Sequence, residues 1–173
     1  IPTLMYDQTD NIEEELINGP NSLFTFWQDH GIGGFRLDVP NMYQDGENSM
    51  YINRKIREVV KSNDPEDLVI GEIWGRANAW LTGEMHDGVQ NMDLRDSFVS
   101  WLKVSSTKDD FINQLLFDQE NYPPQAFYSQ WTLLGNHDTN RILTALNDDK
   151  TLVKLAATLQ FTYPGVPVIY YGD

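Results

Sequence analysis

The sequence predicts an α/β fold built on a parallel sheet. Three observations support this: the strand candidates are almost continuously apolar, they alternate with helical segments, and ionisable residues collect where the strands end. The chain has 173 residues, enough for one core, whereas a closed barrel of eight strands typically needs about 250. We expect no linker, low-complexity stretch or second domain.

The first third of the chain reads as a loop, two helices and a strand. Residues 1 to 10 are expected to be a loop, and residues 11 to 17 a first helix. A second helix, capped by Asn21, ends at Gly31. The glycine-rich segment that begins there precedes an apolar strand over residues 33 to 39, so it fits a helix end better than a nucleotide-binding loop, which would follow its strand.

The remaining elements continue the alternation of helix and strand. Apolar residues at helical spacing predict helices, and short apolar runs bounded by turn residues predict strands. Asp87 to Asn91 is a weaker strand candidate than the others, and Thr151 is the expected cap of the last helix. The predicted helices cover residues 50–61, 95–104, 108–117, 139–146 and 151–161, and the predicted strands cover residues 68–73, 87–91, 131–136 and 166–171.

Composition limits the classes of partner and site. The net charge of −14 and the pI of about 4.4 argue against nucleic acid and against anionic membrane surfaces as partners. Cysteine is absent, which excludes disulfides and thiolate metal sites. The sequence shows no run of 18 apolar residues and no signal peptide, so localisation stays open between the cytoplasm and secretion.

Two ionisable residues lie within the apolar strand over residues 33 to 39. Arg36 and Asp38 are two positions apart, so their side chains point to the same face of the strand. The guanidinium would keep the carboxylate ionised, as a carboxylate nucleophile requires. These residues alone fit a structural ion pair equally well, because buried ion pairs also occur without catalysis.

Further ionisable residues follow later strands. Glu72 comes 34 residues after Asp38, about one βαβ unit, and Asp138 comes 66 residues after Glu72, about two units. His137 precedes Asp138 at the end of its strand. Function in parallel α/β sheets is built at the carboxyl ends of the strands. Three carboxylates converging on one edge favour a catalytic site over a structural ion pair.

Metal chemistry is the competing interpretation. The string Gly135-Asn136-His137-Asp138 is similar to the Asn-His-Asp motif of metallophosphoesterases, but their Asp-x-His and Gly-Asp-x-x-Asp ligand motifs do not occur upstream. We therefore predict no metal ligands. Glycoside hydrolysis fits the residue types better, since it needs one carboxylate nucleophile and one carboxylic acid.

Four strings along the chain resemble signature regions of the α-amylase family of glycoside hydrolases. They are Gly34-Phe35-Arg36-Leu37-Asp38, Gly71-Glu72-Ile73-Trp74, Leu134-Gly135-Asn136-His137-Asp138-Thr139 and the run over residues 164–173. The resemblance covers essentially the whole chain. It implies a partial (β/α)8 barrel, about strands 4 to 8 with their helices.

The resemblance also implies roles for individual residues. Asp38 would be the nucleophile of a retaining mechanism, and Glu72 would be the acid that protonates the leaving oxygen and then the base. Asp138 would stabilise the transition state, and His137 would bind sugar hydroxyls. Arg36 would support Asp38 and count among the substrate-binding residues.

Further residues receive weaker assignments. Trp74 would be a stacking platform on the leaving-group side, with packing as its alternative role, and Asn41 a substrate-binding residue. Arg141 follows the third string, and we regard it as structural. No cofactor is expected at the catalytic site, whereas the resemblance is compatible with a structural calcium elsewhere in the full-length protein.

The substrate implied is an α-glucan. The strings resemble most closely the neopullulanase, cyclomaltodextrinase and maltogenic amylase branch, although Met42 replaces the glutamate common there. Oligo-1,6-glucosidase, amylopullulanase and transglycosylase activities stay open, as does a non-catalytic carbohydrate-binding relative. The family's first three barrel strands have no counterpart here. We therefore expect a piece of a longer protein, inactive or nearly inactive alone, whose full-length form is compatible with a homodimer.

Overall fold

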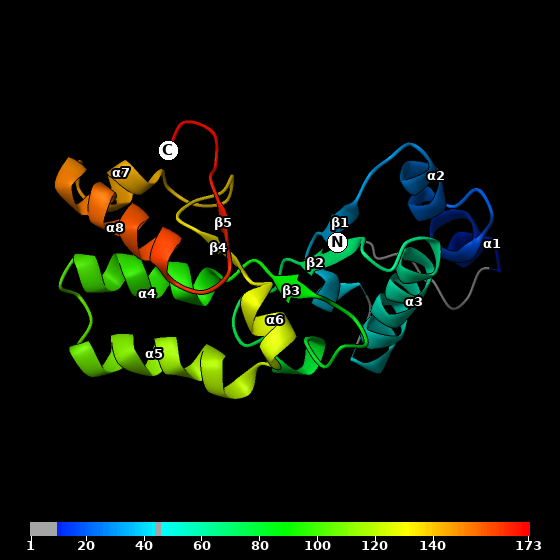
Figure 1. The fold of residues 1–173 in the computed structure, drawn as a ribbon, viewed down its shortest axis with the longest axis horizontal. Helices are drawn as coiled ribbons and strands as arrows, with labels where there is room; N and C mark the ends of the chain where they lie inside the picture. The colour runs from blue at the N-terminus through cyan, green and yellow to red at the C-terminus, as the bar shows by residue number, and fades with distance from the viewer. Residues whose placement is uncertain (1–9, 44–45) are drawn as a thin grey trace. The chain divides into compact units, whose positions relative to one another are not determined.

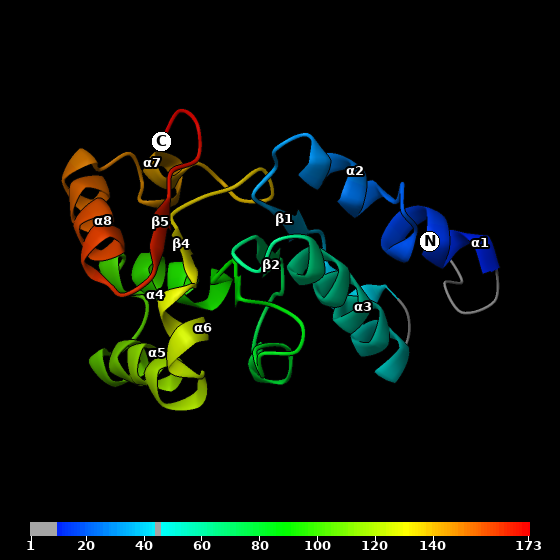
Figure 2. The ribbon, with the colours of Figure 1, turned by 45° about the vertical axis from the view of Figure 1, so that its right-hand side comes forward.

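The structure is a computed structural model that describes residues 10–43 and 46–173, and it divides into two compact units. The described part of the first unit comprises residues 10–43, 46–73 and 79–87, and the second unit comprises residues 74–78 and 88–173. Figures 1 and 2 show the elements of both units. The expected loop over residues 1 to 10 lies outside the described residues, apart from its last position.

Two parallel strands form the centre of the first unit. Strand β1 (Gly34–Leu37) pairs with β2 (Leu68–Gly71), with Gly34 opposite Leu68 and Leu37 opposite Gly71. Both strands were predicted, and each is shorter than its apolar run. Gly34 has a φ of +142°, and a Cβ there would lie 2.4 Å from the carbonyl oxygen of Leu68, so the close pairing of the two strands requires glycine.

Helices precede, connect and follow these strands. They are α1 (Asp10–Glu13), η1 (Glu14–Asn18), α2 (Leu23–Asp29), η2 (Pro40–Met42), α3 (Glu47–Asn63) and η3 (Asn78–Trp80). Figures 1 and 2 show α2 beside α3, and the two helices pack against each other. The prediction that Asn21 caps α2 was wrong by one residue, because Ser22 has the extended backbone of a cap and its Oγ accepts the N–H of Thr25 at 3.4 Å.

The first helical segment also differs from the prediction. An α-helix over residues 11 to 17 was expected, but only α1 is α-helical, and η1 continues it as a π-helix. The N–H of Gly19 donates to the carbonyl oxygen of Glu14 at 2.8 Å, which closes the wider turn. A local hydrophobic pattern does not distinguish the two helix types.

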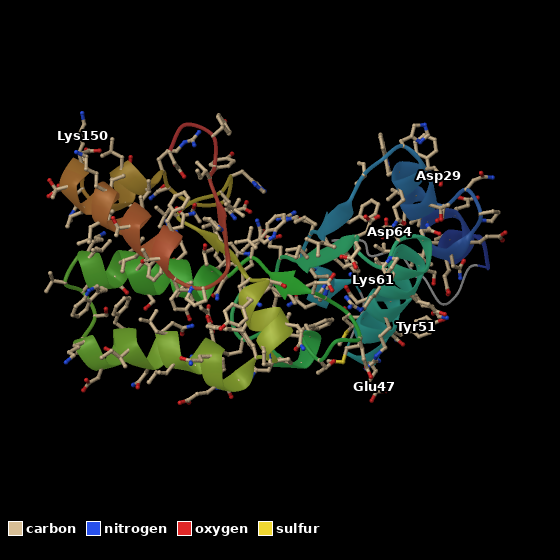
Figure 3. The ribbon with its side chains drawn as sticks, in the orientation of Figure 1. Asp29, Glu47, Tyr51, Lys61, Asp64 and Lys150 are labelled. Carbon is tan, nitrogen blue, oxygen red and sulfur yellow. The ribbon has the colours of Figure 1, made fainter. Side chains whose placement is uncertain are left out.

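The core of the first unit lies between β1, β2 and the amphipathic helix α3. Apolar side chains of α3 are buried at helical spacing, whereas Glu47 and Tyr51 lie on its outer side (Figure 3). Burial of each large apolar side chain contributes about 1.5–3 kcal/mol relative to exposure. The buried apolar residues of this core are Ile17, Phe24, Leu37, Ile52, Ile56, Val60 and Val69.

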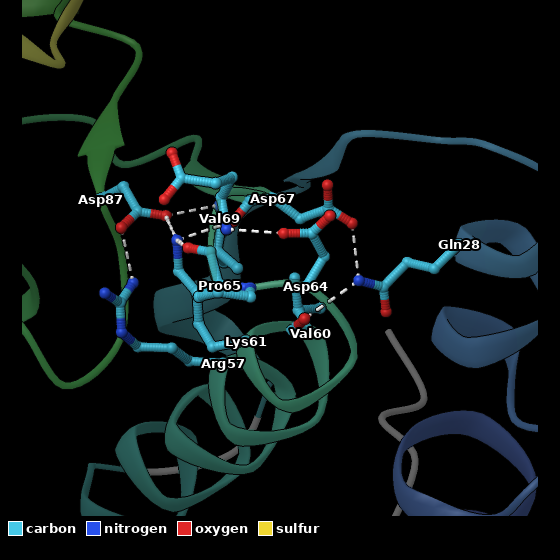
Figure 4. Close-up of polar contacts among 10 residues, drawn as sticks. Gln28, Arg57, Val60, Lys61, Asp64, Pro65, Asp67, Val69 and Asp87 are labelled. Carbon is cyan, nitrogen blue, oxygen red and sulfur yellow. Dashed lines mark hydrogen bonds and ion pairs between the residues drawn. The ribbon is translucent and has the colours of Figure 1, made fainter.

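A polar network holds the amino end of β2 (Figure 4). The Asp87 carboxylate accepts the N–H of Val69 at 2.8 Å, and Arg57 and Lys61 lie 2.8 and 3.1 Å from it. Burial alone would raise the pKa of Asp87, but the Val69 N–H and the two cations lower it below its ordinary value. Lys61 also donates to the carbonyl oxygen of Asp67 at 2.7 Å, so the network ties the end of α3 to the start of β2.

The second unit also contains a parallel strand pair. Strand β4 (Trp131–Leu133) pairs with β5 (Val166–Val168), with Leu133 opposite Val168. Strand β3 (Gly88–Val89) corresponds to the weak candidate over residues 87 to 91, and the next residue, Gln90, forms a parallel bridge with Trp131. The predicted strands are therefore present, again shorter than their apolar runs.

Helices connect the strands of this unit. They are α4 (Met92–Leu102), α5 (Lys108–Asn121), α6 (Pro124–Tyr128), α7 (Ile142–Ala145) and α8 (Lys150–Thr162). Helix α4 packs against both α5 and α8, as Figure 1 shows. Their shared core contains Leu94, Phe98, Leu102, Leu134, Ile142, Leu146 and Ala156.

The predictions for these helices need several corrections. Helix α4 begins at Met92 instead of residue 95, α5 extends to Asn121 instead of residue 117, and α6 was not predicted. Helix α7 begins at Ile142 instead of residue 139, because the preceding residues form a hydrogen-bonded turn. The cap of α8 is Asp149 and not Thr151, since Oδ1 of Asp149 accepts the N–H groups of Thr151 and Leu152 at 2.7 and 3.2 Å. Within the described residues, no helix is both long and apolar enough to cross a bilayer.

Candidate active site

The ends of β1 and β2 place two carboxylates at the same level of the sheet. Asp38 follows Leu37, Glu72 follows Gly71, and these preceding residues are opposite each other in the strand pairing. The N–H of Glu72 donates to the carbonyl oxygen of Leu37 at 2.9 Å, which extends the pairing by one step. The strand register therefore brings Asp38 and Glu72 to one edge, as the sequence predicted.

Arg36 contacts both carboxylates. Its Nη1 lies 2.7 Å from Oδ1 of Asp38, and its Nη2 lies 2.8 Å from Oε2 of Glu72. The side chain of Asp38 is 71% exposed, whereas that of Glu72 is 3% exposed. The contact between Arg36 and Asp38 was expected from their spacing, but the contact between Arg36 and Glu72 was not. One carboxylate thus faces solvent, and the other is buried behind the shared guanidinium.

The backbone after Asp38 adopts an unusual conformation. Val39 has φ 34° and ψ 54°, in the left-handed region that a β-branched residue rarely occupies. Its N–H points to Oε2 of Glu72 at 3.3 Å. Sequence reasoning missed this residue. The available signal was Pro40, because a residue before proline is driven out of the right-handed helical region.

A buried histidine lies against the other strand end. The ring of His86 is 1% exposed, and three of its atoms would lie 3.3 Å from a Cβ on Gly71, next to Glu72. Neither ring nitrogen has a hydrogen-bond partner. Burial, helped by the charge of Arg57, lowers the pKa of His86 to about 4, so the ring is neutral at physiological pH. No pattern in the sequence marked this histidine.

The loop after β4 carries the second pair of predicted site residues. Nε2 of His137 lies 3.2 Å from Oδ2 of Asp138, and both side chains are about half exposed. The N–H of Asp138 donates to Oδ1 of Asn136 at 3.0 Å, and the N–H of Asn136 donates to Oγ1 of Thr139 at 3.0 Å. These bonds form a compact turn that presents His137 and Asp138 to solvent.

The remaining predicted residues are also exposed. Asn41 lies in η2, three residues after Asp38, and Trp74 lies two residues after Glu72 with 47% of its surface exposed. The structure thus groups Arg36, Asp38 and Glu72 in the first unit. His137 and Asp138 are grouped in the second unit.

The chemistry of the first group is that of acid, base and nucleophile. An exposed carboxylate held by a guanidinium can attack an electrophilic carbon, and a buried carboxyl group beside it can exchange a proton. Among residues 10–43 and 46–173, no three His, Asp or Glu side chains are grouped so that they could hold a metal ion.

Known proteins share both sequence and fold with this chain. It is 38% identical over 149 residues to Neopullulanase 2 from Thermoactinomyces vulgaris and 37% identical over 151 residues to a cyclomaltodextrinase from Geobacillus thermopakistaniensis strain MAS1. Each match covers 86% of this chain and 25% of the relative. The chain thus spans about a quarter of the length of these two relatives.

Solved structures of glycoside hydrolases also match the fold of this chain. A cyclic alpha-maltosyl-(1→6)-maltose hydrolase from Arthrobacter globiformis, in complex with maltose, matches with a TM-score of 0.80 and 30% identity, covering 87% of this chain and 33% of the hydrolase. The fold is therefore part of a (β/α)8 barrel. The family model for the alpha amylase catalytic domain matches residues 1–173. The chain belongs to the alpha-amylase catalytic-domain family.

Proposed function

We propose that the full-length protein is a retaining glycosidase that cleaves α-glucosidic bonds in starch-type oligosaccharides and polysaccharides. Residues 1–173 supply the C-terminal part of its catalytic barrel, about strands 4 to 8, and all of them belong to that one domain. The observation that carries the proposal is the contact of Arg36 with both Asp38 and Glu72 at the ends of paired strands.

In the first step, a carboxylate oxygen of Asp38 attacks the anomeric carbon while Glu72 gives a proton to the leaving glycosidic oxygen. The glycosidic bond breaks and a covalent glycosyl-enzyme forms. In the second step, Glu72 takes a proton from water, whose oxygen displaces Asp38 from the anomeric carbon. The guanidinium of Arg36 holds the Asp38 carboxylate in position for the attack.

The other site residues bind the sugar. Asp138 stabilises the positively charged transition state, and its contact with His137 orients the imidazole toward sugar hydroxyls. Trp74, 47% exposed, offers an indole for stacking on a sugar ring, and Asn41 offers an amide for its hydroxyls.

The substrates follow from the names of the relatives. Neopullulanase 2 and the cyclomaltodextrinases support pullulan, cyclodextrins and malto-oligosaccharides as substrates. Carboxylate chemistry of this kind needs no cofactor at the site, and a structural calcium would lie elsewhere in the full-length protein. A homodimer of the full-length protein is testable by sedimentation velocity.

The test uses the full-length protein with cyclodextrin, pullulan and soluble starch. Glu72→Gln and Asp38→Asn should each lower kcat by at least about 1,000-fold while cyclodextrin still binds. Glu84→Gln is the matched control, because Glu84 is an exposed glutamate that pairs with Arg54 on the surface. Unchanged turnover in Glu72→Gln would refute the role of Glu72.

Product analysis separates this proposal from its alternatives. Water and a sugar hydroxyl can both intercept the glycosyl-enzyme, so longer products would identify a transglycosylase. Cleavage restricted to α-1,6 bonds would identify an oligo-1,6-glucosidase. Binding without any turnover in the wild type would identify a non-catalytic relative. The isolated 173-residue chain should be inactive or nearly so, and turnover by it would contradict the proposed incompleteness of its site.

A further inference from the structure

Two segments of the second unit leave the same edge of a strand pair. Residues 135–141, here named the 135–141 loop, follow β4, and residues 170–173 follow β5. Because the strands are parallel, with Leu133 opposite Val168, both segments emerge at their carboxyl ends. The loop carries the predicted site residues His137 and Asp138, whereas the segment after β5 carries no predicted site residue.

Arg141, the last residue of the loop, reaches the segment after β5. Its Nη1 donates to the carbonyl oxygen of Tyr171 and lies 3.6 Å from Oδ1 of Asp173. Its guanidinium carbon lies 4.7 Å from the ring centroid of Tyr170 and 4.5 Å from that of Tyr171. A planar guanidinium can make these polar and aromatic contacts together, whereas a lysine ammonium cannot.

Asp173 also lies close to the first residue of the loop, where it leaves little room for a side chain. A Cβ placed on Gly135 would lie 3.1 Å from Oδ2 of Asp173 and 3.5 Å from Oγ1 of Thr139. The Asp173 side chain is 9% exposed, although its partner Arg141 is 40% exposed. One aspartate therefore lies next to the beginning of the loop and pairs with Arg141 at its end.

Hydrogen bonds inside the loop connect its two ends to the site residues His137 and Asp138. Hydrogen bonds from the Asn136 and Asp138 N–H groups close the turn, and the N–H of Thr139 donates to the carbonyl oxygen of Asn136 at 3.3 Å. A turn with fixed internal bonds moves as a body when its ends move. The direction of the Asp138 carboxylate thus depends on how Gly135 and Arg141 are held.

We propose that Arg141 and Asp173 are positioning residues that fix the 135–141 loop and thereby aim Asp138 at the reacting sugar. The inference rests on the proposed function, in which Asp138 stabilises the transition state. The ion pair is long, at 3.6 Å, and the Arg141 side chain is 40% exposed, so the pair contributes little to global stability. Its effect is on catalysis, where a displacement of about 1 Å can cost a factor of about 100 in rate.

The kinetic test compares variants of the full-length protein on cyclodextrin. Arg141→Ala, Asp173→Asn and the double variant should each lower kcat by about 10- to 100-fold while KM changes less than about threefold. The double variant should be no worse than the poorer single variant, because both substitutions remove the same attachment. Arg141→Lys should recover part of the loss, because it keeps the charge but not the planar contacts.

Arg54→Ala is the matched control. Arg54 forms an exposed pair with Glu84 at 2.9 Å, outside the proposed site, and its loss should leave kcat unchanged. Values of kcat for Arg141→Ala equal to those of this control would overturn the inference while leaving the proposed function intact.

Hydrogen exchange provides a readout that needs no activity. In Arg141→Ala, the amides of Asn136 and Asp138 should exchange at least about tenfold faster than in the wild type, with the amides of β4 and β5 unchanged. Unchanged loop exchange would overturn the inference, and so would faster exchange with unchanged kcat. If the wild type cleaves no α-glucan, the proposed function fails, and loop exchange alone decides whether Arg141 holds the loop.

Discussion

Nη2 of Arg36 lies 2.8 Å from Oε2 of Glu72. The Glu72 side chain is only 3% exposed, so this contact pairs a buried carboxylate with a cation. The same guanidinium holds the exposed Asp38 through its other terminal nitrogen. One arginine therefore sets the environment of both carboxylates. A substitution of Arg36 should affect folding and catalysis together, whereas most surface arginines affect neither.

Arg36→Ala should lower the unfolding free energy of the full-length protein by about 2–4 kcal/mol, because the buried Glu72 side chain loses its ion pair with the guanidinium. It should also lower kcat/KM at least about 100-fold, since Asp38 loses the guanidinium that holds its carboxylate in position for attack. Chemical denaturation and steady-state kinetics measure the two effects. In Arg54→Ala, the control, unfolding free energy should change by less than about 0.5 kcal/mol; an equal change in both variants would contradict the assignment.

Val39→Gly tests the left-handed backbone next to Asp38. Glycine adopts φ 34° without strain, so the relief of about 1 kcal/mol should offset the larger conformational entropy of glycine in the unfolded chain. The net change in unfolding free energy should stay below about 1 kcal/mol. Val69→Gly, at a buried strand position, should lose at least about 3 kcal/mol. Comparable losses at both positions would show that Val39 is not strained.

Asp87→Asn tests the network at the amino end of β2. The pKa of Asp87 is lowered in the folded protein, so its contribution to stability is present above its ordinary pKa and is lost as the pH falls through the folded pKa. The variant should lose about 2 kcal/mol at pH 7, because Arg57 and Lys61 then face a neutral amide. Thermal unfolding should show that this difference shrinks in acid, and a constant difference would refute the ion-pair account.

His86→Phe tests the buried imidazole beside Gly71. The unfolded chain protonates the ring near pH 6.5, whereas in the fold the lowered pKa of His86, about 4, keeps the ring neutral. The wild type should therefore lose on the order of 3 kcal/mol as the pH falls from about 6.5 to about 4. Phenylalanine leaves no unsatisfied ring nitrogen and does not titrate, so the variant should lack this part of the pH dependence. Unfolding free energies measured between pH 4 and pH 7 decide; identical pH profiles would contradict the prediction.

Much of the fold could be predicted from the sequence, because it depends on local patterns. The apolar runs ending at Asp38 and Glu72 identified β1 and β2, and the spacing of Ile52 and Ile56 identified α3. Helix ends were less predictable, since neighbouring residues compete to cap a helix. Ser22 rather than Asn21, and Asp149 rather than Thr151, provide the caps, and the choice depends on backbone angles that a single sequence does not reveal.

One contact of the candidate site could be predicted from the sequence, and another could not. The spacing of Arg36 and Asp38 within one strand revealed their contact, because alternation along a strand is local. The contact between Arg36 and Glu72 depends on the register of two strands 34 residues apart, which no local pattern encodes. The conformation of Val39 and the packing of His86 on Gly71 depend likewise on tertiary structure.

The pairing of Leu37 with Gly71 makes the contact between Arg36 and Glu72 sensitive to the number of residues in each strand. Inserting one residue between Leu68 and Gly71 would turn the Glu72 side chain to the opposite face of the sheet, away from Arg36, without altering any catalytic residue. An insertion in the turn between α3 and β2 would leave that orientation intact. In directed evolution of the full-length protein, length variation should therefore be tolerated in this turn and eliminated within β1 and β2.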